Sequence, residues 1–158
     1  MSQKHTYTTA DYIEWDTMLS LVRKLYRDGN YRLSLLIACG CFFGLRISDL
    51  KRLTWRMLID NEKFSIVEKK TNKYREVKIN EGLKSHINDC FRALDIRNKD
   101  ELCFVNRYGN PISIQMINRH LKVIKVKYNL KIEHFSSHSF RKTFGRKIVE
   151  KAGTQSEM

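Results

Sequence analysis

Proline is almost absent from this sequence, and with it the usual material of a flexible linker. The 158 residues include one proline, Pro111, and seven glycines, and no repeat or low-complexity tract is present. We therefore expect a single domain, residues 1–158, of a size that buries one hydrophobic core without disulfides or metals. Hydrophobic residues make up 42% of the chain, which favours folding over disorder.

We also expect no membrane-spanning segment and no export signal. No apolar run reaches the roughly 20 residues that cross a bilayer, and the first residues, MSQKHTYTTADY, contain no apolar segment typical of a signal peptide. The four cysteines follow no metal-ligand spacing, and Cys39 and Cys41 lie within an apolar run, as small core residues do. Because free thiols fit a reducing compartment, we expect a soluble, intracellular protein.

Acidic residues are few relative to basic ones. The chain has 17 Asp and Glu residues against 30 Lys and Arg residues, which gives a net charge of +13. An excess of this size favours a polyanionic partner, with nucleic acid ahead of an anionic membrane surface. The alternative is a basic surface without a specialised partner.

The spacing of apolar residues predicts an α+β fold that is mainly helical, with a small antiparallel sheet. The segment 33–43 is apolar nearly all round and predicts a buried helix that Gly44 ends. Two β-prone segments, Phe64–Val67 and Glu76–Ile79, flank the polar stretch EKKTNKYR and predict a hairpin. The other expected elements are a helix from Thr8 or Thr9 to Gly29, a short helix capped by Ser48, a helix capped by Asn80, a strand at LCFV (102–105), a helix from Ser113, and a helix from His138 to about Lys151 with Gly153 as its stop.

Four residues carry chemistry if the fold brings them together: Arg46, Lys70, His138 and Arg141. A guanidinium presents a planar fork of donors that matches two phosphate oxygens, and it stays charged at any working pH. Two such forks could clamp one phosphodiester and neutralise the charge that grows during attack at phosphorus. Histidine exchanges a proton near neutral pH, and a hairpin lysine could protonate a leaving alkoxide. Fixed cations of this kind require no metal or other cofactor.

Each of these residues also has an ordinary structural interpretation. Arg46 could pair with Asp49, and the lysines of EKKTNK are typical of a solvated turn. The pattern HxxR, formed by His138 and Arg141, is common. His134 and His138 stand four residues apart, as helical metal ligands do, but no third ligand is evident nearby.

Three motifs in order make the chain resemble the catalytic domain of the tyrosine recombinases, the phage and mobile-element integrase family. The first, GLRISDL, is similar to the family's first arginine box, with Arg46 as the phosphate-binding arginine and Asp49 as its acidic support. The second, VEKKTNKYREVKI, resembles the catalytic hairpin. Its best register places Lys70 at the catalytic lysine, with Lys69 and Lys73 as alternatives.

The third motif, SSHSFRKTFGRKI, resembles the family's second box, HxxRH. His138 and Arg141 match its catalytic residues, whereas Lys142 stands where many members carry histidine. The role of Lys142 is therefore open, with phosphate contact favoured. Together the motifs extend the resemblance from about Thr9 to Lys151, nearly the whole chain.

The resemblance implies double-stranded DNA as the substrate, cut and rejoined through a 3′-phosphotyrosine without a metal or nucleotide cofactor. It also implies other recombinase protomers as partners, in dimers or tetramers on DNA, and a bacterial, cytoplasmic, nucleoid-associated location. The residues expected to contact DNA in addition to the catalytic set are Lys69, Lys73, Arg75, Arg119, Lys122, Lys125 and Lys142.

The tyrosine that this family uses as its nucleophile has no counterpart after the second box. All seven tyrosines precede His138, and only Tyr74, on the hairpin, is expected anywhere near a scissile phosphate. The family's amino-terminal core-binding domain has no counterpart either. We therefore expect a partial catalytic domain, a fragment rather than a naturally truncated copy, that holds the phosphate clamp and is inactive on its own.

Two other functions stay open. A non-enzymatic DNA-binding module could use Arg119, Lys122 and Lys125 as a basic stripe, and phosphate contacts alone would explain the net charge. A relaxing enzyme similar to type IB topoisomerases would share the chemistry by resemblance, but the short chain and compact motifs argue against it. The sequence does not indicate the target site, or whether the reaction is integration, excision or resolution.

Overall fold

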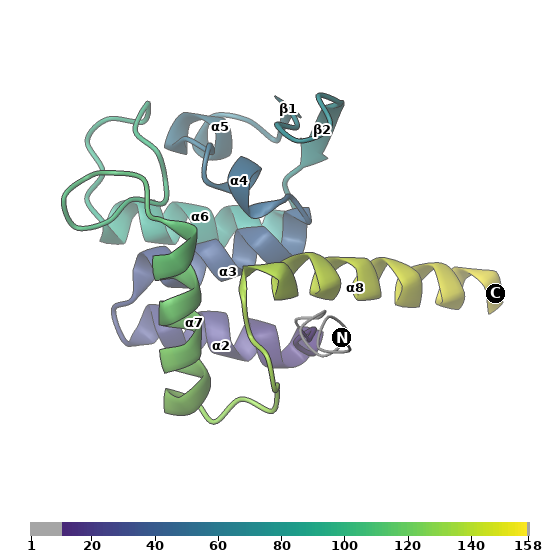
Figure 1. Ribbon diagram of the computed structural model, residues 1–158. Coiled ribbons are helices and arrows are strands. Elements are labelled where there is room, and N and C mark those ends of the chain that lie inside the picture. Colours follow the sequence, from purple (N-terminus) through teal and green to yellow (C-terminus); the bar gives the residue numbers. More distant parts are fainter. Residues whose placement is uncertain (1–10, 158) are drawn as a thin grey trace, which may run out of the picture.

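The computed structural model describes residues 11–157, in which helices form most of the structure and a two-stranded antiparallel sheet lies at one edge (Figure 1). The elements are α2 (Trp15–Arg27), α3 (Tyr31–Phe43), α4 (Ile47–Leu50), α5 (Trp55–Ile59), β1 (Lys63–Val67), β2 (Tyr74–Lys78), α6 (Glu81–Ala93), α7 (Ile114–Lys127) and α8 (Ser137–Glu157). The expected α+β class, mainly helical with a small sheet, is confirmed. No helix in this range is long and apolar enough to cross a membrane.

Helix α3 is the centre of the fold. It is apolar on every side, and its Leu35 and Ile37 side chains are fully buried among α2, α6 and α8 (Figure 1). Gly40 allows α8 to approach closely, because a Cβ there would lie 2.5 Å from the Phe140 ring. Gly44 meets Phe144 in the same way one turn later, so α3 and α8 run in the same direction. The first turns of α8 therefore lie beside the carboxyl end of α3.

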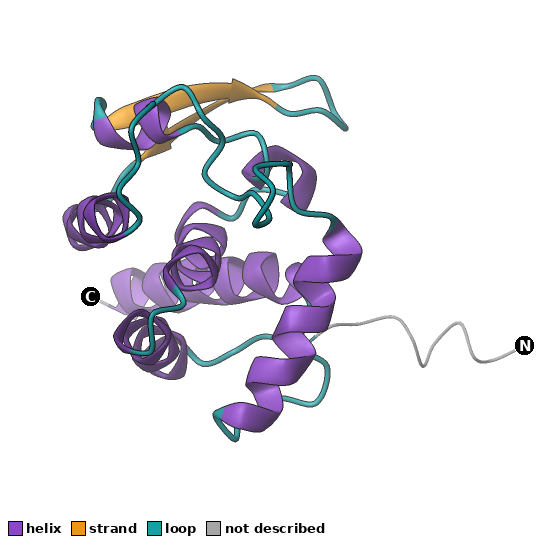
Figure 2. Ribbon diagram, turned by 90° about the vertical axis from the view of Figure 1, so that its left-hand side faces the viewer, coloured by secondary structure: helices purple, strands orange, loops and turns teal. Residues whose placement is uncertain are grey.

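The predicted hairpin is confirmed, and it covers that same end of α3. Phe64 of β1 lies opposite Val77 of β2, Ile66 lies opposite Arg75, and these residues face the body of the protein. The Phe64 ring packs edge-on against Phe43, the last residue of α3, with centroids 5.3 Å apart. Figure 2 shows the sheet as a layer along one side of the helices.

The cap expected at Asn80 is confirmed, and α7 has a cap at Ser113, where a helix was expected to start. The Asn80 side chain accepts hydrogen bonds from two backbone amides at the start of α6. The Ser113 hydroxyl accepts one at the start of α7. Ser48, by contrast, is not a cap: α4 begins at Ile47, and the extended residue before it is Arg46. Arg46 thus occupies a fixed backbone position between the glycine that ends α3 and the first turn of α4.

Some other expected bounds are wrong. Thr8 and Thr9 lie outside the described residues. Among the described residues, the first helix begins at Trp15. Helix α8 continues through Gly153, since a glycine inside a helix costs only about 1 kcal/mol. The segment 102–105 forms isolated bridges instead of a strand.

Candidate functional site

The candidate site is built on the carboxyl end of α3. Gly44 ends the helix in the left-handed conformation, with φ of 66°, and donates its N–H to the carbonyl of Gly40. A Cβ at Gly44 would lie 2.2 Å from the Phe144 ring, so glycine is required for both backbone and space. The last carbonyls of the helix have no partner within it, and they carry the partial negative charge that attracts cations.

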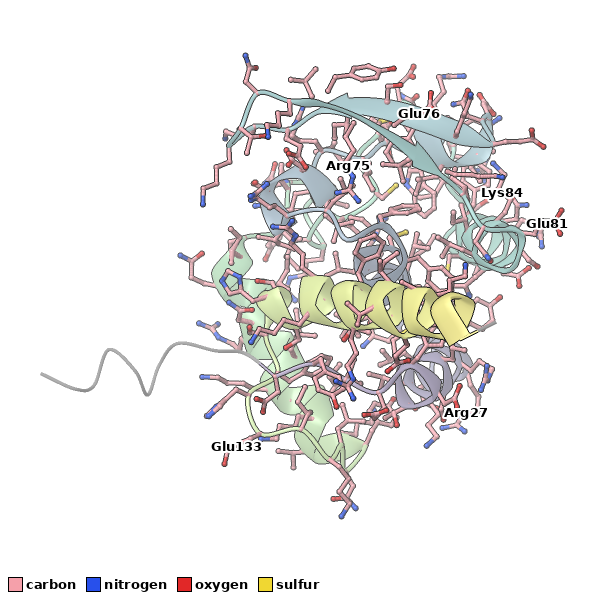
Figure 3. The ribbon with its side chains drawn as sticks, turned by 90° about the vertical axis from the view of Figure 1, so that its right-hand side faces the viewer. Arg27, Arg75, Glu76, Glu81, Lys84 and Glu133 are labelled. Carbon is pink, nitrogen blue, oxygen red and sulfur yellow. The ribbon has the colours of Figure 1, made fainter. Side chains whose placement is uncertain are left out.

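Two arginines from distant segments bind these carbonyls. Arg141 of α8 donates its Nε hydrogen to the Gly44 oxygen at 3.0 Å. Arg75 of β2 donates from Nη2 to the Phe43 oxygen at 2.6 Å and from Nη1 to the Gly44 oxygen at 3.3 Å. Figure 3 shows Arg75 on the side of the hairpin that faces the helices. Among the described residues, the Nη groups of Arg141 form no hydrogen bond, so both stay available to a ligand.

Arg46 joins the same cluster through Glu68. The Arg46 Nη1 atom lies 3.6 Å from Oε1 of Glu68, and the other Glu68 oxygen lies 3.7 Å from Nη1 of Arg75. The Arg46 and Arg75 side chains are each 27% exposed, whereas that of Glu68 is 11% exposed. The carboxylate is therefore buried more deeply than the two guanidinium groups that it links. We name Arg46, Arg75 and Arg141 the arginine cluster.

The charges of the arginine cluster act on one another. Burial lowers the pKa of the Arg141 guanidinium, and the positive charges of Arg46 and Arg75 lower that pKa further. The carboxylates of Glu68 and Asp49 oppose the effect. Three cations near two carboxylates leave an excess of positive charge, which a phosphate would neutralise.

Asp49 supports the hairpin rather than Arg46. Its carboxylate is fully buried, and Oδ1 accepts hydrogen bonds from Nη1 of Arg52 at 2.7 Å and from the backbone N–H of Lys69 at 3.0 Å. Arg52 also donates to the carbonyl of Val67, the last residue of β1. The expected partner of Arg46 is thus replaced by Glu68, and Asp49 ties α4 to the turn between the strands.

That turn, residues 68–73, has a closed backbone. The Glu68 N–H donates to the Lys73 carbonyl and the Asn72 N–H donates to the Glu68 carbonyl, both at 2.8 Å. Asn72 takes a positive φ of 60°, and the Thr71 hydroxyl donates to Oε1 of Glu68 at 2.7 Å. The three lysines of the turn are exposed: Lys69, Lys70 and Lys73. The turn therefore holds its backbone in place while its lysine side chains extend into solvent.

His138 and Lys142 lie in the first turns of α8. His138 is exposed, and it precedes Arg141 by three residues, which places both on one side of the helix. Lys142 lies near Asp11, because its charge contributes to a lowered pKa of that carboxyl group. The main cause of that lowering is the backbone hydrogen bond from His134. His134 itself precedes α8, so it does not share a helix face with His138.

Helix α7 brings part of the expected basic stripe next to α8. Its Asn118 side chain accepts a hydrogen bond from the Ser137 N–H at 2.9 Å, at the start of α8. Arg119 and Lys122 are exposed, whereas Lys125 is half-buried and donates to the carbonyl of Glu133. The accessible cations of the stripe are thus Arg119 and Lys122.

Tyr74 lies next to Arg75 in sequence but on the other face of the hairpin. Its hydroxyl forms a hydrogen bond with the Ser65 hydroxyl at 2.6 Å, and its side chain is among the exposed ones. Since successive residues of a strand point to opposite faces, Tyr74 points away from the arginine cluster. The other described tyrosines make no hydrogen bond to this cluster.

The chain is similar to known proteins in both its sequence and its fold. The sequence profile of the phage integrase family matches residues 13–156, nearly the whole described chain. The chain belongs to this family. It is similar to the tyrosine recombinase XerH of Campylobacter jejuni, with 25% identity over 130 residues, which cover 80% of this chain and 36% of XerH.

Solved integrase and recombinase structures share the fold. XerA recombinase superposes with a TM-score of 0.73 at 17% identity, over 89% of this chain and 51% of XerA. The Tn1549 transposon integrase, in complex with transposon right end DNA, gives 0.71 at 17% identity, over 87% of this chain and 52% of that one. The lambda integrase catalytic core gives 0.64 at 16% identity, over 86% of this chain and 81% of the core. This integrase-family chain thus spans about half the length of the XerA chain and a smaller share of XerH.

Arg75 of the arginine cluster and its partner Glu68 were not predicted in the positions they occupy. Glu68 was treated as part of a polar connection, and Arg75 as a residue free to contact DNA. A strand that begins at Tyr74 instead of Glu76 gives Arg75 the same face as Val77, which is buried. This alternation could have predicted the inward position of Arg75, but only if the start of the strand had been predicted two residues earlier. Glu68 follows Phe64 and Ile66 at the same two-residue spacing and is likewise buried, but it lies one residue beyond β1.

Proposed function

We propose that this chain is the phosphate-binding part of a site-specific tyrosine recombinase, which cuts and rejoins duplex DNA through a 3′-phosphotyrosine. The observation that carries the proposal is the convergence of Arg46, Arg75 and Arg141 at the end of α3. Membership of the phage integrase family and the DNA complex of the similar Tn1549 integrase support double-stranded DNA as the substrate.

Arg46 and Arg141 bind the scissile phosphate in this proposal. The Nε of Arg141 is held by the Gly44 carbonyl, so its two Nη groups are pre-oriented as a fork for two phosphate oxygens. Arg46 reaches the same cluster through Glu68, and its charge acts on Arg141. As phosphorus becomes five-coordinate, these donors stabilise the added negative charge, and losing one should cost about 3–4 kcal/mol of transition-state stabilisation.

Proton transfer falls to Lys70 and His138. When the bond between phosphorus and the 5′ oxygen breaks, the leaving alkoxide needs a proton, which the ammonium of Lys70 supplies from the exposed turn. His138, on the same side of α8 as Arg141, assists proton transfer at the phosphate. The chemistry assigned to these residues uses no metal or other cofactor. The exposed cations Lys69, Lys73, Arg119, Lys122 and Lys142 hold flanking phosphates.

The attacking tyrosine comes from outside these 158 residues in this proposal. A phenolate must form a bond to phosphorus as the 5′ oxygen leaves, and Tyr74 points to the wrong face of the hairpin. The nucleophile would belong to a longer polypeptide or to another protomer, in a dimer or tetramer on DNA. The chain alone is then inactive in cleavage. A protein that acts on DNA in this way would work in the bacterial cytoplasm at the nucleoid.

A nicked suicide duplex tests the proposal, with denaturing electrophoresis as the readout. A longer protein that carries this chain and a tyrosine segment should form a covalent protein–DNA band. Arg46→Ala should remove the band. Arg97→Ala, which removes the same charge at a side chain that is 84% exposed, should leave it. A covalent band from the 158-residue chain itself would contradict the assignment of the nucleophile.

A non-enzymatic DNA-binding module is the second candidate, favoured by the exposed Arg119 and Lys122 beside α8. In such a module each cation should contribute about equally to affinity. The clamp instead predicts that Arg46→Lys in the longer protein abolishes cleavage while duplex affinity changes little. A longer protein that binds DNA but never cleaves it would favour the module.

A further inference from the structure

We propose that Glu68 is a positioning residue that holds Arg46 and the Lys70 turn together in the unbound protein, and that the DNA phosphate replaces it at Arg46. The inference rests on the proposed function, since it concerns the same phosphate. Glu68 is none of the catalytic residues that the three motifs match. Its role is to couple phosphate binding to the hairpin.

The contacts of Glu68 link Arg46, Arg75 and the turn between the strands. Its Oε1 lies 3.6 Å from Arg46 and accepts the Thr71 hydroxyl hydrogen at 2.7 Å, while Oε2 lies 3.7 Å from Arg75. Its backbone closes the turn that carries Lys70, two residues further along. One buried carboxylate thus contacts the first-box arginine, the hairpin arginine and the turn.

The two arginines are held with different strength. Arg75 has backbone carbonyls as firm acceptors, at 2.6 Å and 3.3 Å. The contact of Arg46 with Glu68 is an ion pair beyond hydrogen-bond length, and among the described residues the Arg46 side chain has no hydrogen bond. A phosphate that offers two oxygens to one guanidinium fork forms shorter, charge-assisted bonds. Arg46 is therefore the member that exchanges its partner, while Arg75 keeps Glu68 paired.

Glu68 has two opposite effects on the bound phosphate. Its negative charge repels the phosphate and weakens binding. Its hydrogen bond with Thr71 and its place at the start of the turn make the turn respond when Arg46 changes partner. A residue that served the fold alone would, on removal, weaken binding or leave it unchanged. Removal of Glu68 should strengthen binding and uncouple the turn.

The test compares Glu68→Gln with Glu76→Gln in the 158-residue chain, using a duplex and two readouts. Both variants remove one negative charge, but Glu76 lies on the outer face of β2, where its side chain is 54% exposed (Figure 3). Duplex affinity is measured at fixed salt, and hydrogen exchange is followed at the Lys69 and Asn72 amides, which are hydrogen-bonded in the turn.

Glu68→Gln should bind the duplex about three- to tenfold more tightly than the wild type, because a like charge is removed next to the phosphate. Glu76→Gln should change affinity less than about twofold, because its charge is solvated and screened. Duplex should change exchange at the turn amides in the wild type and in Glu76→Gln, but not in Glu68→Gln. Thr71→Val removes the hydrogen bond between the turn and the Glu68 carboxylate and leaves Arg46 paired with Glu68. It should also lose the change in exchange, but it should not bind the duplex more tightly.

The outcomes separate the two proposals. If the wild-type chain binds no duplex, the proposed function fails. If it binds, and Glu68→Gln matches Glu76→Gln in affinity or retains the turn response, the role of Glu68 is overturned while the function stands. If Glu68→Gln does not fold, Thr71→Val still tests the coupling. A wild-type change in hydrogen exchange at the turn amides of Thr71→Val would contradict the coupling.

Discussion

Arg141 donates its Nε hydrogen to the backbone carbonyl of Gly44 at 3.0 Å, across 97 positions of the chain. This bond joins the two arginine motifs through the end of a buried helix instead of through a carboxylate. It fixes the base of the Arg141 side chain and leaves its terminal groups free for a ligand. The helix end thus acts as the anchor of the proposed phosphate clamp.

The anchor depends on glycine at position 44. Gly44→Ala should destabilise the fold by about 2 to 5 kcal/mol, from left-handed backbone strain and from overlap with the Phe144 ring. Urea unfolding measures the loss. The matched control is Gly145→Ala, inside α8 with open space around it, which should stabilise by about 0.5–1 kcal/mol. Equal stability of the two variants would disprove the requirement at Gly44.

Arg141→Lys should fail to replace the arginine although it keeps the charge. A lysine cannot bind the Gly44 carbonyl through an inner nitrogen and still present a fork of two donors. We expect duplex affinity to fall by about tenfold, the equivalent of one lost charge-assisted hydrogen bond. Fluorescence anisotropy with a labelled duplex gives the affinity. Wild-type affinity in Arg141→Lys would mean that charge alone matters there.

Arg75 and Lys73 should behave differently although both are basic hairpin residues. Arg75→Ala leaves the Phe43 carbonyl without its donor, so we expect a loss of about 1–3 kcal/mol of stability in thermal or urea unfolding. Lys73→Ala should change stability by less than about 0.5 kcal/mol. If Lys73 binds a phosphate, the slope of log affinity against log salt should fall by about 0.9. Unchanged stability in Arg75→Ala would contradict its anchoring role.

Asp11 should make stability depend on pH in the acid range. Backbone N–H groups of His134 and Glu133 donate to its carboxylate and lower its pKa below the ordinary value of 3.8. Because the folded-state pKa is the lower one, this stabilisation is present above pH 3.8 and is lost as the pH falls through the folded value. Asp11→Asn should be less stable than the wild type at neutral pH. The difference should shrink as the pH falls below 3.8, and a difference in unfolding that stays constant over that fall would contradict this assignment.

The sequence predicted the helices and the hairpin well because their signals are local. The apolar segment of α3, the cap at Asn80, the helix start at Ser113 and the helix end at Gly44 each depend on neighbouring residues. The course of α8 through Gly153 was missed, since glycine permits a helix stop without requiring one. Thus local chemistry was sufficient for most elements, but α5 was not predicted, the strand expected at 102–105 is absent, and some bounds differ.

The partners within the site were harder to predict because they depend on tertiary contacts. Arg46 had a carboxylate three residues away in Asp49, yet the fold buries Asp49 against the hairpin turn and brings Glu68 to Arg46. Lys125 fits the basic stripe by helical spacing, but a carbonyl at Glu133 binds it. Periodicity assigns a residue to a face of a helix and does not say which segment covers that face.

A structure of this chain bound to a DNA duplex tests the central claim most directly. We predict that one phosphate lies within hydrogen-bond distance, about 3 Å, of both the Arg46 and the Arg141 guanidinium groups, with the Lys70 side chain beside it. Arg141 should still donate to the Gly44 carbonyl. Arginines bound to different phosphates, or Arg46 still paired with Glu68 while DNA lies elsewhere, would contradict the account.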